Sequence, residues 1–302
     1  MTLDTMRMRY FLEIARAGSL TRAAKELHVA QSALSLHLRS LEDDMGTSLF
    51  DRLPRGVTLT EAGKILFSHC QSIMRAIEQA EHATKDVGVN PTGDVIIGII
   101  FSLFPTLGIS ILEDCKKRFP GIRVMMCEGD SKRLRESLEN QTHDIVIMPQ
   151  DIPAPTAQVL FEESMYVIGP AGYFPSDSAT IHPREVLQLP LIVPPEKHEI
   201  WFTINSFSER EGIQPNIVWR IEGLAATKHA IRCNLGFSLL TLSAISDGME
   251  KEQYSFAKIS NGDVNRVIVL DMATSHPATR AMKEVHQLIL ENWPRYMEHS
   301  FK

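Results

Sequence analysis

Polar side chains that can pair with nucleic-acid bases recur on one face of a predicted helix near the start of the chain. In the segment 19–42, a helix beginning near Gln31 would turn Leu34, Leu38 and Leu41 inward. Its other face carries Gln31, Ser32, Ser35, His37 and Arg39. Gln can pair with adenine, Arg with guanine or phosphate, and Ser with several base edges. The periodicity predicts either a groove-reading helix or a plain helical hairpin with a solvated polar face.

A preceding helix would hold that face in place. Ser19 can cap a short helix that carries Ala23, Ala24 and Leu27. The segment 28–30 then makes a tight turn, so the two helices form a helix-turn-helix, whose second helix lies in the major groove. Residues 7–39 hold six basic and two acidic side chains, which favours a local DNA-binding surface.

The composition excludes several classes of protein. The chain has 302 residues, of which 44% are hydrophobic and 23% charged, as in a globular protein of about two domains. The net charge of −6 argues against indiscriminate nucleic-acid binding, and all of it lies in residues 91–302, with 20 basic and 26 acidic groups. Four cysteines without a CxxC pair indicate a reducing compartment. The N-terminus shows no signal-peptide pattern, so we expect a cytoplasmic protein.

A longer pattern resembles the signature of the LysR-type transcriptional regulators. It includes Gln31-Ser32-Ala33-Leu34-Ser35, Leu41-Glu42, Met45-Gly46, Leu49-Phe50-Asp51-Arg52, Arg55-Gly56-Val57 and Leu59-Thr60-Glu61-Ala62-Gly63. The resemblance implies an α/β protein with a winged helix-turn-helix (1–59), a linker helix that dimerises (60–90) and a two-lobed effector domain like the periplasmic binding proteins (91–302). It further implies double-stranded DNA, a small organic effector, a second copy in a dimer or tetramer, and RNA polymerase as partners.

The resemblance also assigns DNA-contacting residues. By position these are Gln31, Ser32, Ser35, Leu36, His37 and Arg39 in the groove, with Arg52 and Arg55 at the wing. The chain departs from many relatives at Ser32, where proline is common, and at Leu36-His37, where polar or cationic residues are frequent. Sequence preference is therefore open, and Leu36 could contact a thymine methyl group.

The predicted linker helix carries a heptad seam. Thr60 is a suitable N-cap. The seam positions, at alternating spacings of four and three, are Leu66, Cys70, Ile73, Ile77 and Ala80. The spacing fits two helices packed along their length, or one helix packed on its own domain. The family resemblance favours the dimer.

From Asp94 onward, strand and helix patterns alternate, which predicts a parallel sheet with helices on both faces. The uncharged run 95–112 is long enough for a membrane span. Its Gly, Ser and Pro residues favour a strand, a loop and a helix start instead. We expect lobe I at about 91–165 and 269–302, and lobe II at about 166–268.

Strand ends in this domain predict where an effector binds, because ligands of such sheets lie beyond the carboxyl ends of the strands. The candidates are Phe101, Ser102, Leu103, Gly129, Asp130, Ser131, Pro195, Lys197, His198 and Leu224. Ser102 and Ser131 precede predicted helices, whose N-termini favour anions. A single serine at such a position is more often a simple helix cap than a ligand contact. Relatives often bind carboxylates here, which implies an anionic effector.

Enzyme signatures such as HExxH, GxSxG or a P-loop do not occur, so we expect no catalytic residues, metal site or cofactor. The adjacent Glu162 and Glu163 would point to opposite faces of a strand. A solute-binding module without transcriptional output is the alternative, and the helix-turn-helix argues against it.

Overall fold

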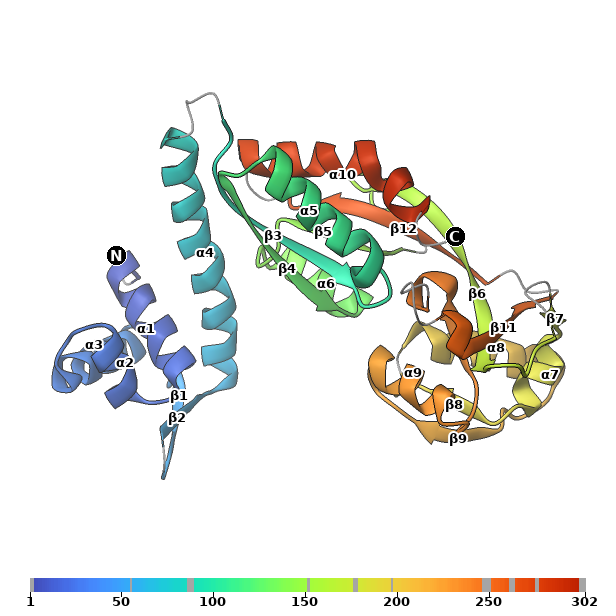
Figure 1. Ribbon diagram of the computed structural model, residues 1–302. Helices are drawn as coiled ribbons and strands as arrows, with labels where there is room; N and C mark the ends of the chain where they lie inside the picture. Colours follow the sequence, from blue (N-terminus) through green and yellow to red (C-terminus); the bar gives the residue numbers. More distant parts are fainter. Residues whose placement is uncertain are drawn as a thin grey trace.

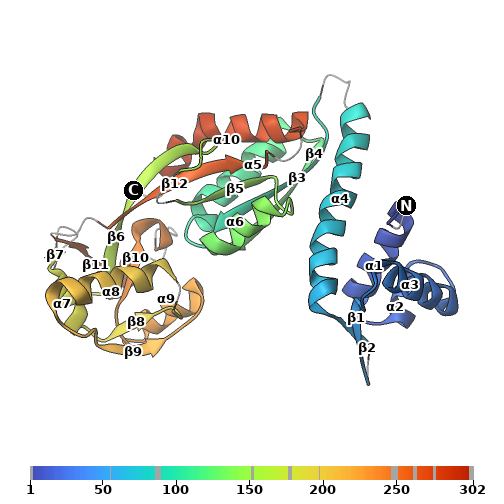
Figure 2. The same ribbon diagram turned by 180° about the vertical axis from the view of Figure 1, so that it is seen from behind.

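The computed structural model describes residues 3–54, 56–85, 90–150, 153–175, 179–196, 198–245, 251–260, 264–274 and 277–298. An N-terminal helical domain leads into one long helix, which is followed by two α/β lobes (Figure 1). The view from behind shows that two long strands connect the lobes (Figure 2). This is the mixed α/β architecture that the sequence predicts.

Three helices and a hairpin form the N-terminal domain. They are α1 (Thr5–Ala17), α2 (Leu20–Glu26), α3 (Gln31–Met45), β1 (Phe50–Leu53) and β2 (Gly56–Leu59). Ser19 caps α2 by accepting the N–H of Arg22, and α3 begins at Gln31, both as predicted. Leu34 and Leu41 are buried in the domain core. Helices α2 and α3 therefore form the helix-turn-helix, and β1 and β2 form its wing.

The long helix α4 (Glu61–Lys85) is fixed to this domain at its first turn. The Thr60 hydroxyl accepts the N–H of Gly63 at 3.0 Å and donates to the carbonyl of Ser48 at 2.8 Å. A Cβ on Gly63 would lie 2.1 Å from the carbonyl oxygen of Leu49. Only glycine permits this close approach of helix and backbone. The winged domain thus sets the direction in which α4 leaves it.

Lobe I begins with a parallel strand unit. Its elements are β3 (Gly93–Ile100), the π-helix η1 (Phe104–Gly108), α5 (Ile109–Arg118), β4 (Ile122–Gly129), α6 (Ser131–Glu139), β5 (Ile145–Pro149) and the later α10 (Arg280–Glu298). Strands β4 and β5 flank β3 in parallel. One hydrophobic core joins these strands to α5 and α10. The run 95–112 is therefore a strand, a short π-helix and the start of α5, as predicted.

Lobe II is built from shorter elements. They are β7 (Thr180–Ile181), α7 (Pro183–Gln188), β8 (Leu191–Val193), α8 (Glu199–Glu211), β9 (Ile217–Arg220), α9 (Leu224–Arg232), β10 (Ser238–Thr241), the 3-10 turns η2 (Leu242–Ala244) and η3 (Lys251–Gln253), and β11 (Tyr254–Ile259). Strands β8 and β9 pair in parallel as a separate ribbon. Two hydrophobic clusters fill the lobe.

The strands β6 (Gln158–Pro170) and β12 (Asn265–Met272) join the lobes. The large sheet has the order β4-β3-β5-β12-β6-β11-β7, with β10 beside β6. One half of β6 pairs with β12, and its other half pairs with β10 and β11, all antiparallel. The predicted parallel pairing therefore holds for β3, β4 and β5, whereas the strands that cross between the lobes pair antiparallel. In the described part of the chain, no helix is long and apolar enough to cross a membrane.

Candidate DNA-binding and effector-binding sites

The outer face of α3 carries the predicted groove-reading residues. Gln31, Ser32, Leu36 and Arg39 are exposed, and Ser35 is half-buried. Leu36 leaves 70% of its surface exposed, which is a large exposure for an apolar side chain in a small folded domain. The exposed stripe along α3 therefore mixes hydrogen-bonding groups with one apolar side chain, as a DNA-reading helix requires.

The wing lies beside this face. Ser35 and Arg39 of α3 and Arg52 of β1 line a common hollow of about 30 Å³. These three candidates therefore share one surface. Arg55 lies outside the described residues. The ring of His37 is half-buried and packs edge-on against Tyr10 of α1, with ring centroids 5.2 Å apart, and its contact with DNA stays a prediction.

The structure corrects part of the dimer seam on α4. Cys70 is completely buried in the core of its own winged domain, and Leu66 packs against the same core. Ile73 is 40% exposed, Ala80 is exposed and Ile77 is half-buried. The heptad therefore serves packing on the helix's own domain in one part, and leaves a second part accessible for a partner helix. Its first half packs on its own domain, whereas Ile73, Ile77 and Ala80 stay accessible.

Ser102 belongs to a polar cluster where the two lobes meet. Arg266 of β12 donates to the Ser102 hydroxyl at 2.7 Å and to that of Thr241 at 3.2 Å. Arg266 also pairs with Glu163 of β6, with its Nε 2.7 Å from Glu163 Oε1. The Ser243 hydroxyl donates to Glu163 Oε2 at 2.7 Å. We call these five residues the hinge cluster.

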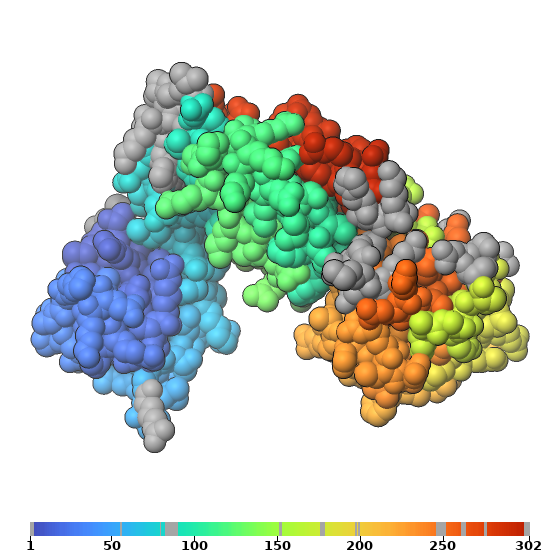
Figure 3. Space-filling view, in the orientation of Figure 1, coloured from blue at the N-terminus to red at the C-terminus, as the bar shows by residue number. Residues whose placement is uncertain are grey.

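The hinge cluster draws on both lobes. Ser102 follows β3 of lobe I, whereas Thr241 ends β10 of lobe II and Ser243 follows it. The side chains of Arg266 and Glu163 are 14% and 5% exposed, so the ion pair is largely removed from water. The space-filling view shows lobe I, in green, lying beside lobe II, in orange (Figure 3). Arg266 thus contacts elements of both lobes.

The helix N-termini do not match the predicted anion sites. Asp130, not Ser131, caps α6 and accepts the N–H of Arg133 at 2.9 Å. A carboxylate therefore already occupies this helix end, which disfavours a second anion there. His198 likewise caps α8 and accepts the N–H of Ile200 through Nδ1. Both helix ends are therefore already capped by a side chain, and a ligand contact of Ser131 or His198 stays a prediction.

The remaining effector candidates are scattered. Phe101 is 41% exposed beside Ser102, while Leu103 is completely buried in the core of lobe I, which contradicts its predicted contact with a ligand. Gly129 is also buried, Pro195 is exposed, and Leu224 packs against a core cluster of lobe II. Lys197 lies outside the described residues. Phe101 and Ser102 lie next to each other at the end of β3, and Ser102 is the effector candidate that contacts the hinge cluster.

Sequence reasoning missed Arg266, Glu163, Thr241 and Ser243. A charged residue at the start of the apolar run of β12 was the available signal, because a charge beside buried strand residues needs a partner. Glu163 did face the opposite side from Glu162, as expected for a strand, but its partner lies on a distant segment.

Comparison with known proteins identifies the family. Residues 6–64 match the family described as "Bacterial regulatory helix-turn-helix protein, lysR family", and residues 89–294 match "LysR substrate binding domain". The chain belongs to the LysR family. It is a DNA-binding transcriptional regulator with a domain for a small-molecule effector.

Curated relatives agree along the whole chain. The nitrogen assimilation regulatory protein Nac of Escherichia coli is 28% identical over 296 residues, covering 96% of both chains. The transcriptional dual regulator GltC of Bacillus subtilis is 27% identical over 248 residues, covering 81% of this chain and 83% of the relative. These relatives are named as regulators and not as enzymes.

Solved structures share the fold. Full-length OxyR from Pseudomonas aeruginosa, in a variant with one cysteine replaced by aspartate, superposes with a TM-score of 0.71 at 21% identity, covering 95% of this chain and 94% of that one. Full-length CbnR complexed with its target DNA gives a TM-score of 0.70 at 17% identity, covering 96% and 99%.

Proposed function

We propose that this regulator is controlled by a small organic anion that binds at the hinge cluster. The observation that carries the proposal is the position of Arg266, which contacts Ser102 of lobe I and Thr241 of lobe II. An arginine presents five donors in a planar fork that matches a carboxylate. Phe101, exposed next to Ser102, supplies an apolar wall for the rest of the ligand.

In this proposal the carboxylate of Glu163 binds the same donors of Arg266 that an effector carboxylate would bind. The Glu163 carboxylate occupies Arg266 in the structure, and an effector carboxylate competes for the same donors. A ligand shifts a protein between two states only by its differential affinity for them. Because the hinge cluster joins β3, β6, β10 and β12, a change in the partner of Arg266 alters how the two lobes are held.

A thermal-shift screen of the full-length protein tests this proposal. The probes are small mono- and dicarboxylates, each paired with its neutral amide. We expect certain carboxylates, and not their amides, to raise the melting temperature of the wild-type protein. Ser102→Ala and Arg266→Met should lose this shift, while the matched control Ser131→Ala keeps it. A shift that survives in both Ser102→Ala and Arg266→Met places the effector elsewhere.

We further propose that the protein binds two DNA half-sites as a dimer formed through α4. Ile73, Ile77 and Ala80 remain accessible beyond the part of α4 that packs on the winged domain. Sedimentation of Ile73→Glu/Ile77→Glu at micromolar concentration should show a smaller species that binds the paired sites weakly. An unchanged mass together with intact DNA binding refutes this interface.

We also propose a location and one further partner. As a transcriptional regulator, the protein would act in the cytoplasm, where its DNA lies, and would contact RNA polymerase at promoters. A bacterial two-hybrid assay against the polymerase subunits, with the Gln31→Ala variant as a control for DNA-bridged signals, tests this contact.

A further inference from the structure

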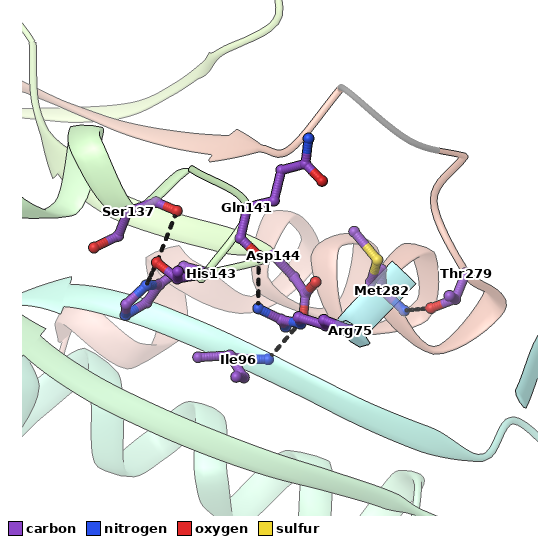
Figure 4. A network of polar contacts seen from close by, with 9 residues as sticks. Arg75, Ile96, Ser137, Gln141, His143, Asp144, Thr279 and Met282 are labelled. Atoms are coloured by element: carbon purple, nitrogen blue, oxygen red, sulfur yellow. Dashed lines mark hydrogen bonds and ion pairs between the residues drawn. The ribbon is translucent and has the colours of Figure 1, made fainter. Parts of the chain in front are cut away.

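Lobe I presents a group of hydrogen-bond acceptors to α4. The carbonyls of Asn140 and Gln141 and the carboxylate of Asp144 form what we call the acceptor socket. From α4, Ser72 donates its hydroxyl to the Asn140 carbonyl. One turn later, Arg75 donates from Nη1 to the Gln141 carbonyl at 3.2 Å and pairs through Nη2 with Asp144 (Figure 4). The socket thus fits a helix that carries a hydroxyl and a guanidinium three residues apart.

Asp144 is part of the framework of lobe I. Its carboxylate accepts the N–H of Ile96 in β3 at 2.8 Å, and its own N–H donates to the Ile96 carbonyl at 2.9 Å. Its carbonyl accepts the N–H of Ala273, just after β12, at 2.9 Å. Its side chain is 1% exposed, and the guanidinium of Arg75 compensates its negative charge. Arg75 therefore binds a loop whose Asp144 is itself hydrogen-bonded to β3 and to the residue after β12.

Little apolar packing supports this junction. A cavity of about 250 Å³ lies between α1, α4 and the start of β3, lined among others by Leu12, Met74, Arg75 and Ile96. Where side chains do not fill the space between two bodies, directional polar contacts decide how the bodies sit. The placement of α4 against lobe I therefore depends on Ser72 and Arg75.

Strand β12 connects this junction to the hinge cluster. Arg266 lies near its first residue, and Ala273 follows its last residue and contacts Asp144. Ala273 lies seven residue steps after Arg266, roughly 23 Å at about 3.3 Å per residue of extended chain. One rigid strand thus has the lobe contact at one end and the α4 contact at the other.

We propose that the acceptor socket is the docking surface of lobe I for α4 of the same chain, and that Arg75 is the positioning residue that sets the winged domain relative to the effector domain. The charge match of Arg75 and Asp144 and the hydrogen bond of Ser72 favour α4 of the same chain as the occupant of the socket. This proposal does not depend on which effector binds, since the socket and Arg75 lie apart from the hinge cluster residues.

Distance measurements between spin labels test the docking. Labels would be placed at Lys64→Cys on α4 and Lys132→Cys on α6, both exposed, with Cys127 and Cys233 replaced by serine. Labelled chain is mixed with an excess of unlabelled chain so that distances within one chain are read. We expect one narrow distance distribution for the otherwise wild-type protein, and a broad or shifted one for Arg75→Met. Arg123→Met, which removes an exposed ion pair with Asp94 in the same lobe, should change nothing.

A second variant controls for misfolding that an uncompensated Asp144 carboxylate would cause. Arg75→Met/Asp144→Asn removes both charges, so no uncompensated carboxylate stays buried, and it should broaden the distribution as Arg75→Met does. A narrow, unshifted distribution in both variants overturns the proposal. So does a narrow distribution that disappears on dilution with unlabelled chain, because α4 of a second copy would then occupy the socket.

DNA binding provides a readout that loss of stability alone would not produce. The probe is a duplex with two half-sites, selected from a random library with the wild-type protein, alongside a duplex with one half-site. Arg75→Met should lose about tenfold in affinity for the paired sites and less than about twofold for the single site. Arg75→Lys should recover part of the loss, because it keeps the charge. Equal losses on both duplexes contradict a positioning role.

Discussion

Arg266 of β12 and Glu163 of β6 stand directly opposite each other in an antiparallel ladder, although 103 residues separate them in the chain. The pair sits where β6 passes from lobe I to lobe II, and it is surrounded by hydroxyls from both lobes. A buried ion pair contributes little net stability compared with apolar residues, but loss of one partner leaves a charge without compensation. The pair therefore fixes the geometry of the hinge more than it adds to stability.

The stability losses from substitutions at this pair should not be additive. We expect Arg266→Met and Glu163→Gln each to lower the free energy of unfolding by roughly 3–5 kcal/mol, and the double variant to lose less than the sum of the two. Urea unfolding of the four proteins gives the coupling. Additive losses would mean that the two side chains stabilise the fold independently. Arg123→Met, at an exposed pair, should leave the midpoint unchanged.

His143 should make the protein sensitive to acid. Its Nε2 is buried and has no hydrogen-bond partner within the described ranges. Burial lowers the pKa of His143 to about 4, with smaller effects from the nearby Arg75 and Arg133. The unfolded chain therefore binds a proton below its ordinary pKa near 6.5, while the folded chain resists it until about pH 4. Stability is lost as the pH falls through this window, by up to about 3 kcal/mol.

His143→Leu should flatten this dependence. Unfolding by urea at pH 7 and at pH 5 compares the two proteins, and the wild type should lose more stability than the variant between these values. Figure 4 shows His143 beside Arg75 and Asp144, so a change at this position also tests the junction described above. Parallel pH profiles for the two proteins would show that His143 titrates normally in the fold.

Two of the four thiols should be unreactive in the folded protein. Burial raises the pKa of both Cys70 and Cys115 to about 11, the latter helped by Asp114. Cys233 is exposed and Cys127 is half-buried. A thiol reagent at pH 8 should therefore label two sites quickly and four only in denaturant, because the thiolate is the reacting form. Fast labelling of Cys70 would contradict its burial in the core of the winged domain and would again favour its assignment to the dimer seam.

Local patterns predicted the DNA-binding half well. The Ser19 cap, the start of α3 at Gln31 and the Thr60 cap each depend on residues only a few positions away. Neighbouring cap formers are harder to separate, and at α6 the sequence favoured Ser131 where Asp130 is the cap. The heptad on α4 has the same spacing whether a helix packs on its own domain or on a second chain, so Cys70 was misassigned.

The effector half was predicted less completely because its contacts are long-range. The strands β3 to β5 were recognised and are parallel, whereas β6 and β12 pair across about a hundred residues and reverse the direction of the sheet. No local signal couples Arg266 to Glu163 or brings Ser102 to them. Leu103 looked like a ligand contact because it follows a strand, yet the chain turns it into the core.

Substitutions in α3 and in the wing should affect DNA binding in different ways, because we expect α3 to read bases and the wing to contact phosphates. Gln31 is exposed at the start of α3, and Arg52 is exposed on β1. We expect Gln31→Ala to cost roughly 1–3 kcal/mol on the selected DNA and much less on random DNA, because a glutamine reads base edges. Arg52→Ala should weaken binding to both and lower the salt slope by about one for each lost phosphate contact. Titrations of both DNAs at several salt concentrations measure this. Equal losses for Gln31→Ala on the two DNAs would exclude it as a base reader, since phosphates are present in every sequence.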